Sequence, residues 1–400
     1  MSKEKRRVPK LRFPGFTEDW EQRKLSEVTT CFDNLRVPVT ASDRVPGKIP
    51  YYGANGIQDY VSGHTHSGEF VLIAEDGAND LNDYPIQYVN GAIWVNNHAH
   101  VIAGYKEKLE NKFLSYSLKT VKMTTFIVGG GRSKLNLKAL LEIPISMPNY
   151  DEQCVIGKFI ETIDINITLH QRKLNNLKLK KKALLQKLFP KNGKRYPELR
   201  FPGFTDAWEQ RKLNDFGIAT GGTSIESEFV DGGTYKVINI GSYSEESVYN
   251  DQGLRVNKTD KTKSRILNKY DLTMILNDKT ASGNIIGRVL LIDQDNTYVY
   301  NQRTERIEVD TKNFLPMFLY HMLNAPEQRK YIVKASQGNT QIYVNWSTIS
   351  NIDYMIPQLL LEQEKIANLF SLINKDITLH QRKLDHLQLQ KKALLQQMFV

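Results

Sequence analysis

Two groups of loops in this sequence are dense in glycine, amide and hydroxyl side chains. Asn, Gln, Arg and Lys can make paired contacts with base edges in DNA, and Ser and Thr hydroxyls can reach phosphates. In the first half of the chain the candidate residues are Asn55, Asn96, Asn97, His98, Arg132 and Lys134. In the second half they are Thr223, Ser224, Asn277, Lys279, Gln302, Arg303, Asn339 and Gln341. The alternative is ordinary turn chemistry, because glycine and asparagine are common in any loop.

Two histidine pairs, His64 with His66 and His98 with His100, have the spacing that places two imidazoles on one face of a strand. Such a pair can begin a metal site, because neutral imidazole is a zinc ligand. No cysteine accompanies either pair, and the nearby carboxylates fall in predicted turns. We therefore expect no metal ion and favour histidines at the surface or at a DNA edge.

The motifs of common cofactor-dependent and hydrolytic enzymes are absent from the sequence. There is no G-x-x-x-x-G-K-[ST] loop for a nucleoside triphosphate and no glycine-rich dinucleotide turn that opens a helix after a strand. Neither G-x-S-x-G nor H-E-x-x-H occurs, and the Asn-Pro-Pro-aromatic sequence of amino-methyltransferases is also missing. We predict that the chain catalyses no reaction by itself and binds no cofactor.

Length, composition and charge describe an ordinary protein of at least two domains. The chain has 400 residues, of which 24% are charged and 40% are apolar, and its net charge is +10. Residues 171–200 hold eight lysines, three arginines and one glutamate, so this segment carries the whole excess and the remainder is neutral. The segment is either a solvated helix end with a linker or a phosphate-binding patch.

The cysteine count and the apolar pattern predict a cytoplasmic protein. Only Cys31 and Cys154 are present, too few for a disulfide framework, which points to a reducing compartment. No run of 18 apolar residues is long enough to cross a membrane. The charged N-terminus is not followed by the apolar segment of a secretory signal.

An internal repeat is the most informative feature of the chain. Residues 11–25 read LRFPGFTEDWEQRKL and residues 199–213 read LRFPGFTDAWEQRKL. A second pair of segments, 167–190 and 377–400, is identical at 17 of 24 positions. The sequences between these blocks are unrelated, so one duplicated frame holds two different inserts.

The second repeated block predicts two long helices, over 151–189 and 362–399. Each begins with acidic and amide residues after a proline and continues with an apolar heptad pattern. At 1.5 Å per residue each helix would be about 55 Å long. Because the intervening segment returns the chain, we expect the two helices to pair as an antiparallel coiled coil. Polar residues on this seam either fix its register or lie where the helices separate into water; they are His170, His380, Lys181 and Lys391.

The two inserts read as mixed α/β domains, with short apolar runs cut by glycine and asparagine and one or two helical patterns. The predicted fold class is therefore α/β (mixed α+β), with two variable domains alternating with two long helices in a pseudo-twofold repeat. The predicted boundaries are 1–150 for the first domain, 151–190 for the first helix, 191–358 for the second domain and 359–400 for the second helix.

This order of parts resembles the specificity (S) subunit of Type I restriction–modification systems. The resemblance rests on the doubled LRFPGFT…WEQRKL entry and on the repeated ITLHQRKL…KKALLQ helices. It also rests on two junctions in which Ile-Pro precedes Glu-Gln, at Ile143-Pro144 with Glu152-Gln153 and at Ile356-Pro357 with Glu362-Gln363. Within the inserts, WVNNHAHV and GGTS…INIG…GNIIGRV look like target-recognition-domain patterns, and the resemblance covers essentially the whole chain.

The resemblance implies a non-catalytic DNA reader. Each target-recognition domain would bind one half of a split, asymmetric site in duplex DNA, and the paired helices would set the spacer between the halves. Two modification subunits, which bind S-adenosylmethionine and methylate adenine, would dock on this subunit, and restriction subunits that use ATP and Mg would join them. The candidate contact residues come from chemistry and loop placement rather than from a family signature.

Two other functions compete with this interpretation. A self-sufficient DNA methyltransferase or nuclease is disfavoured by the missing cofactor motifs. A two-domain protein–protein adaptor would also suit the polar loops. Binding to duplex DNA with a steep salt dependence would separate the adaptor from the DNA reader, because DNA binding releases counterions.

Overall fold

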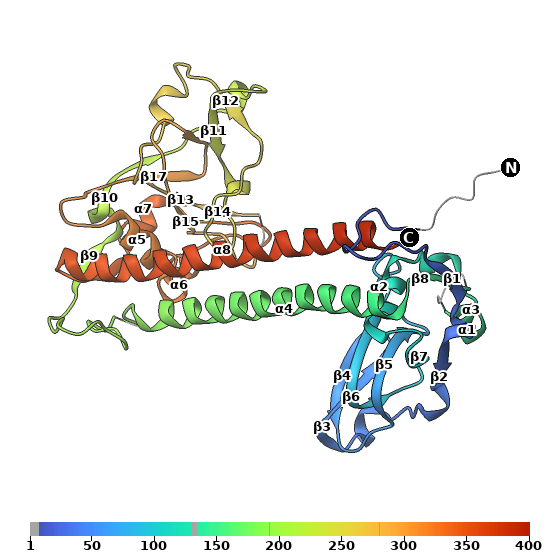
Figure 1. Cartoon of the computed structure of the whole chain (residues 1–400). Coiled ribbons are helices and arrows are strands. Elements are labelled where there is room, and N and C mark those ends of the chain that lie inside the picture. Colours follow the sequence, from blue (N-terminus) through green and yellow to red (C-terminus); the bar gives the residue numbers. More distant parts are fainter. Residues whose placement is uncertain (1–7, 130–133, 192, 280) are drawn as a thin grey trace. The chain divides into compact units, whose positions relative to one another are not determined.

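The computed structural model describes residues 8–129, 134–191, 193–279 and 281–400. The chain forms two compact units (Figure 1). Unit 1 contains Met1–Arg172 and Gln381–Val400, and unit 2 contains Lys173–His380. Both long helices are therefore divided between the units, and each unit includes helical residues from both copies of the repeat.

Unit 1 is built around a six-stranded sheet with the strand order β2-β7-β5-β6-β3-β4. Neighbouring strands are antiparallel except β3 and β6, which are parallel. The strands are β2 (Thr29–Cys31), β3 (Pro46–Gly53), β4 (Gly56–Val61), β5 (His66–Ala74), β6 (Ile86–Val95) and β7 (Ala99–Gly104). A separate ribbon joins β1 (Glu21–Lys24) to β8 (Pro144–Met147). We call the part of unit 1 from β1 to β8 the first variable domain.

Three short helices complete the first variable domain: α1 (Leu25–Val28), α2 (Asn111–Thr120) and α3 (Leu137–Leu141). Helix α2 begins after Glu110, whose carboxylate accepts a hydrogen bond from the Phe113 N–H at 2.6 Å. This cap satisfies a backbone donor that the helix itself leaves unpaired. Helix α2 contacts β5, β6 and β7 and buries Phe113, Leu114 and Leu118 completely.

Unit 2 has a four-stranded antiparallel sheet with the order β10-β17-β13-β15 and a three-stranded sheet with the order β12-β11-β16. Two ribbons pair β14 with β18 and β9 with β19. The strands of the two sheets are β10 (Gly217–Gly221), β11 (Tyr235–Ile238), β12 (Arg255–Val256), β13 (Leu272–Ile275), β15 (Val289–Leu291), β16 (Tyr298–Tyr300) and β17 (Thr304–Val309). The ribbons are formed by β9 (Glu209–Lys212), β14 (Asn277–Asp278), β18 (Ile342–Tyr343) and β19 (Asp353–Ile356). The helices are α5 (Pro316–Leu323), α6 (Pro326–Lys334) and α7 (Trp346–Ile349). We call the part from β9 to β19 the second variable domain; its sheets share no strand order with those of the first.

The two long helices expected from the repeat are α4 (Tyr150–Lys187) and α8 (Leu360–Met398). In unit 1, Ile156 and Ile160 of α4 share a core with Leu394 and Met398 of α8. Farther along α4, Asp164 pairs with Lys391 at 2.5 Å, so the partner residue on α8 moves toward its N-terminus and the helices run antiparallel. The predicted mixed α/β architecture with two paired long helices is therefore confirmed.

For Lys391, the structure distinguishes the two interpretations of the polar seam residues, which either fix the register of the helices or lie in water where the helices separate. Its side chain is only 18% exposed, and besides pairing with Asp164 its ammonium lies 5.5 Å from the Tyr116 ring centroid. A half-buried cation with these partners is held within the pair, not released into water. This is the arrangement expected of a polar residue that fixes register.

The first repeated block joins each variable domain to the helices. In unit 1, Arg12 makes a two-pronged ion pair with Glu152, with both hydrogen bonds at 2.7 Å and the Glu152 side chain fully buried. In unit 2, Arg200 pairs in the same way with Glu362 at 2.8 Å. Because Arg presents two parallel donors to a carboxylate, these contacts fix both orientation and position.

The last residues of each long helix enter a core. In unit 1, the Phe399 ring stacks on the Phe113 ring with 5.3 Å between the ring centroids. It also contacts the Trp20 ring edge-on, with 6.2 Å between the centroids. In unit 2, the centroid of the Phe189 ring lies 5.9 Å from that of Phe318 and 6.5 Å from that of Trp208. The repeated LQ-x-x-F ending thus supplies an aromatic side chain to the core of each unit.

In the described part of the chain, no helix combines the length and the apolar character needed to cross a lipid bilayer.

We predict that Phe399→Ala destabilises unit 1 and that Phe189→Ala destabilises unit 2, each by about 3–5 kcal/mol, because each substitution leaves a cavity in a packed aromatic core. Hydrogen exchange resolved by segment measures the two units separately. Leu389→Ala is the matched control on α8, because Leu389 is 68% exposed, and it should change stability by less than about 0.5 kcal/mol. A loss of protection in both units after Phe399→Ala would contradict the prediction.

Candidate nucleic-acid interface

In the first variable domain, candidate residues from three segments gather around the loop that follows β5. The Asn55 amide donates to the Gly77 carbonyl at 2.8 Å, and the Asn79 N–H donates to Asn55 Oδ1 at 3.0 Å. His98 Nδ1 lies 2.5 Å from Asp76 Oδ1. The structure therefore brings the β3–β4 turn and the residues before β7 together at one loop, residues 75–79.

Asn96 and Asn97 are neighbours with different roles. Asn96 is 4% exposed, and its Oδ1 accepts a hydrogen bond from the His98 N–H at 2.8 Å. It therefore holds the turn from a buried position, and its assignment as a direct DNA contact stays a prediction. Asn97 is exposed at the tip of this turn, and His98 keeps 40% of its side chain exposed. These two remain candidates for contact with an outside partner.

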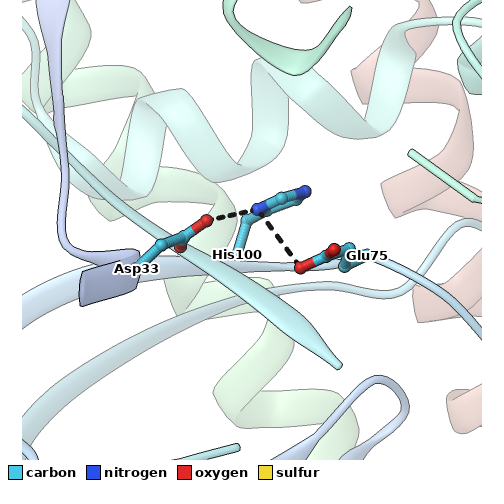
Figure 2. Close-up of side chains that lie close together, drawn as sticks. All are labelled: Asp33, Glu75 and His100. Atoms are coloured by element: carbon cyan, nitrogen blue, oxygen red, sulfur yellow. Dashed lines mark hydrogen bonds and ion pairs between the residues drawn. The ribbon is translucent and has the colours of Figure 1, made fainter. Parts of the chain in front are cut away.

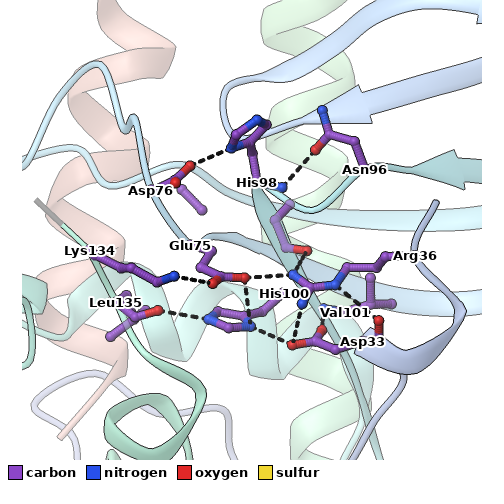
Figure 3. A network of polar contacts seen from close by, with 12 residues as sticks. Asp33, Arg36, Glu75, Asp76, Asn96, His98, His100, Val101, Lys134 and Leu135 are labelled. Carbon is purple, nitrogen blue, oxygen red and sulfur yellow. Dashed lines mark hydrogen bonds and ion pairs between the residues drawn. The ribbon is translucent and has the colours of Figure 1, made fainter. Parts of the chain in front are cut away.

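Lys134 belongs to a cluster of ion pairs beside the same loop (Figure 3). Its ammonium lies 2.8 Å from Glu75 Oε1, and Arg36 lies 2.7 Å from Glu75 Oε2 and 3.3 Å from Asp33 Oδ2. His100 Nδ1 lies 2.6 Å from Asp33 Oδ2 and 3.8 Å from Glu75 Oε2 (Figure 2). The cluster ties together segments that are distant in sequence, and Lys134 is still 46% exposed above it.

The geometry of this cluster lowers the pKa values of its two carboxyl groups, those of Asp33 and Glu75. The second ring nitrogen of His100, Nε2, lies 2.7 Å from the Leu135 carbonyl oxygen. Both ring nitrogens thus lie within hydrogen-bonding distance of oxygen atoms, and these two contacts fix the orientation of the ring. Burial would raise the pKa of the Asp33 carboxyl, but hydrogen bonds from His100 and the Val101 N–H outweigh it and hold that pKa below its ordinary value. For Glu75, burial is likewise outweighed by Lys134 and Arg36, which lower its pKa.

Asp33, Glu75 and His100 have the residue types of a metal site, and their ligand atoms lie within 4.8 Å of one another. Arg36 and Lys134 already pair with the two carboxylates, and His100 Nδ1 lies 2.6 Å from Asp33 Oδ2. A divalent cation would have to displace these charges. The arrangement fits an ion-pair cluster that fixes loops, and we assign no metal to it.

The expectation of surface histidines was wrong for two of the four. His66 is 2% exposed and lies 2.7 Å from Thr65 Oγ1 and 3.1 Å from the Phe32 carbonyl oxygen, and burial lowers its pKa. His100 is 1% exposed in the cluster described above. Alternation along a strand cannot reveal these partners, because they come from distant segments.

In the second variable domain, Thr223 and Ser224 are exposed on a loop that its neighbours hold firmly. A Cβ at Gly222 would lie 2.0 Å from the Asn301 carbonyl oxygen, so only glycine fits there. The Asn301 side chain accepts hydrogen bonds from the Ile225 N–H at 3.1 Å and from the Gln302 N–H at 2.8 Å. These contacts place the Gly221–Ile225 loop beside the turn that carries Gln302, whose own amide donates to Glu226 at 3.2 Å.

Arg265 contacts this loop from another segment of the chain, and the sequence did not indicate it. Its guanidinium lies 5.2 Å from the Tyr300 ring centroid and donates to the Thr223 hydroxyl at 3.1 Å, to the Tyr300 hydroxyl at 3.0 Å and to the Gly221 carbonyl. Its partners are 35 to 44 residues away in the chain. No local pattern marks such a residue, although its charge beside a polar loop is suitable for a nucleic-acid surface.

A second group of candidates meets at the β14–β18 ribbon. Asn277 pairs with Tyr343 across the ribbon, and the Leu276 N–H donates to the Arg303 carbonyl at 2.9 Å. Arg303 has a φ of 64°, an uncommon conformation for a residue with a side chain, and is exposed. The fold thus brings to one area Asn277, Lys279, Arg303, Asn339 and Gln341, of which all but the half-buried Asn277 are exposed. The last candidate, Arg132, lies outside the described residues.

Comparison with known proteins agrees with this arrangement. A profile of the Type I restriction modification DNA specificity domain matches residues 17–179 and again residues 205–389. The "Putative type I restriction enzyme specificity subunit S.HindORF215P" of Haemophilus influenzae is 49% identical over 143 residues, which are 36% of this chain and only 37% of that protein. The type I restriction enzyme MjaVIII specificity subunit of Methanocaldococcus jannaschii is 24% identical over 96% of this chain and 92% of its own length.

The fold is also similar to a solved structure. The crystal structure of the Type-I restriction-modification system S subunit from M. genitalium superposes with a TM-score of 0.72 at 13% identity, covering 98% of this chain and 99% of that one. The two profile matches together take in both variable domains and most of both long helices. The chain therefore belongs to the Type I restriction–modification specificity family, the DNA-recognition component of that system and not a catalytic one.

Proposed function

We propose that this chain reads a bipartite, asymmetric site in duplex DNA and assembles a Type I complex on it. In this proposal, residues 1–150 read one half-site and residues 191–358 read the other, while residues 151–190 and 359–400 form the spacer between them. The observation that carries the proposal is the repeat, because one frame with two unlike domains is suited to two unlike half-sites.

The loops of the two domains support different readings. The first domain offers Asn97, His98 and Lys134 around the 75–79 loop. The second offers Thr223 and Ser224 on one loop and Arg303 with its neighbours on another. Amide and guanidinium groups distinguish base pairs in the major groove, whereas hydroxyl and ammonium groups mostly position the backbone. Since the two sets differ in residue type and in supporting strands, the two half-sites should differ in sequence.

The long helices have a length suited to a spacer. Their 38 and 39 residues correspond to about 57 Å at 1.5 Å per residue. At roughly 3.4 Å per base pair, this length matches two half-sites of three or four pairs and a short spacer.

Partner subunits have matching surfaces to bind on the two helices. Leu169 and Leu379 occupy the same place in the repeat and are 55% and 62% exposed, and Leu179 and Leu389 are 66% and 68% exposed. Two exposed leucines at equivalent places in two copies suit two copies of one partner. We assign this partner as the modification subunit, which would supply S-adenosylmethionine, while restriction subunits would supply the sites for ATP and Mg.

The proposal predicts that deleting the gene removes one split, asymmetric N6-methyladenine motif from the genome of the host. The measurement is a genome-wide methylation map with and without the gene. If the map is unchanged, this chain is co-expressed with its modification subunit. This second experiment excludes the explanation that the host does not express that subunit. If co-expression also yields no bipartite motif, the proposed function is wrong.

Each domain should alter only its own half-site. We predict that Asn97→Ala changes one half of the methylated motif and that Arg303→Ala changes the other, at a cost of about 1–3 kcal/mol for a base-reading contact. Methylation mapping and duplex binding with single-base variants measure the two effects. Lys106→Ala and Lys312→Ala, at exposed positions away from these loops, are the controls. A variant that weakens all sites equally would place its residue on phosphate instead.

The helix leucines should control assembly. We predict that Leu169→Glu together with Leu379→Glu prevents both modification subunits from binding, while either change alone leaves one bound, because the two surfaces are equivalent. Native mass spectrometry of the co-purified complex counts the subunits. Lys178→Glu with Gln388→Glu, on another flank of the helices, is the matched control. Retention of two subunits by the double leucine variant would exclude this surface.

A further inference from the structure

Glu305 is a buried carboxylic acid in the second variable domain that the fold leaves without a hydrogen-bond donor. The residue is 6% exposed and lies in β17, paired with Gly221 of β10 and with Met274 of β13. Within the described residues, no N–H or O–H group bonds to its carboxyl oxygens, and Arg265 is the charged group that acts on it. Buried carboxylates are normally paired and hydrogen-bonded, so this one lacks the partners that its burial requires.

Arg265 does not supply the missing hydrogen bonds. Its terminal nitrogens are committed to the Gly221 carbonyl, the Thr223 hydroxyl and the Tyr300 hydroxyl. Its Nε is also buried without an acceptor among the described residues. Burial, opposed only by the charge of Arg265, raises the pKa of Glu305 to about 7. The ionised acid therefore destabilises the fold near neutral pH, and no hydrogen bond among the described residues of the domain accounts for its presence.

Gly221 leaves the carboxyl group open on one side. A Cβ at this position would lie 3.3 Å from Glu305 Oε2, and its three nearest atoms would all belong to the Glu305 carboxyl group. The φ of Gly221 is not positive, so its backbone does not require glycine. This differs from Gly222, where the Asn301 carbonyl oxygen excludes any side chain. Gly221 is exposed, so the space over the Glu305 carboxyl faces the surface of the loop.

The opening lies among the residues proposed to read DNA. Gly221 begins the loop that presents Thr223 and Ser224, and the Gly222 N–H donates to the Thr304 carbonyl at 2.8 Å, next to Glu305. A carboxylate accepts hydrogen bonds and repels phosphate and the acceptor atoms of guanine and thymine. In the major groove, the matching donors are the amino groups on N6 of adenine and N4 of cytosine.

We infer that the Glu305 carboxylate accepts a hydrogen bond from the exocyclic amino group of an adenine or cytosine that reaches it past Gly221, and thereby specifies one base of the second half-site. This inference rests on the proposed function, because it requires that the second variable domain reads DNA. The buried Glu305 carboxylate then lowers the stability of the domain and also distinguishes one base of the second half-site from the others.

The test compares the methylated motifs of cells that express the complete complex with wild type, Glu305→Gln or Gly221→Ala. Each variant should make one position of one half-site degenerate, because the glutamine amide also presents a donor and the alanine methyl covers the opening. All other positions should remain unchanged. Glu308→Gln is the matched control, since this carboxylate is on the same strand, is 57% exposed and pairs with Arg306.

Two further measurements use the purified complex and duplexes that carry the wild-type motif or a single substitution. The preference for the correct base should be about tenfold or more at pH 8 and should fall toward pH 6 in wild type, because protonation removes the acceptor, while Glu305→Gln shows no such trend. The raised pKa means that the folded state holds the proton more tightly than the unfolded state, so stability falls as pH rises from about 4.5, where the acid ionises in the unfolded chain, to about 7, where it ionises in the folded one. Glu305→Gln should therefore raise the melting temperature more at pH 8 than at pH 5.

The outcomes are distinct. If the wild-type complex yields no bipartite motif, the proposed function fails. If it yields one and both Glu305→Gln and Gly221→Ala leave every position intact, the Glu305 carboxyl meets only water and the inference is overturned. Loss of the whole motif in a variant that still assembles and melts normally would also overturn it, because that result assigns Glu305 to the general strength of binding.

Discussion

The packing of helix ends into the variable domains is the contact on which the rest of the fold depends. Helix α4 follows the first variable domain in sequence, yet its last residues, with Phe189, complete the core of unit 2. Helix α8 follows the second variable domain, and Phe399 after it completes the core of unit 1. Each core also contains residues of the helix that follows its domain directly, such as Ile156 and Ile160 of α4 in unit 1 and Phe370 of α8 in unit 2. Each long helix is therefore fixed at both ends by tertiary contacts, which a helix of this length needs because pairing along one seam leaves most of its surface in water.

One frame can carry two unlike domains because different residues attach the domains to the helices and fix the loops. The same arginine–glutamate pair, Arg12 with Glu152 and Arg200 with Glu362, attaches each domain to its helix, so attachment does not depend on the loops. The loops are fixed by local polar contacts instead, such as the Asp33–His100 pair in the first domain. Because loop support and frame support use separate residues, the loops can change without loss of the frame.

The sequence predicts the frame well and the reading surfaces only partly, for a physical reason. Long helices have a local period, and a repeat doubles the signal, so α4 and α8 are visible in the sequence alone. Exposed loop residues such as Asn97 and Arg303 are also found by their type. The burial of Asn96 and His100 was not predicted, and Arg265 and Glu305 were missed, because burial and pairing depend on segments tens of residues away. A carboxylate that lacks a donor cannot be recognised until its surroundings are known.

The two copies of the frame differ in charge at one polar position of the helix pair. In unit 1, Asp164 accepts a hydrogen bond from the Tyr116 hydroxyl at 2.8 Å and pairs with Lys391. The corresponding positions in the second copy hold Asn374 and Lys181, and the charge of Lys181 acts on the ring of His321. Burial, and then the charge of Lys181, lowers the pKa of His321 to about 3, and its Nε2 lacks a partner among the described residues. With an amide in place of the carboxylate, Lys181 has no acidic partner at this position of the facing helix. The carboxylate that acts on Lys181 belongs instead to Glu246 of the second variable domain, so the two copies of the frame hold the same lysine through different partners.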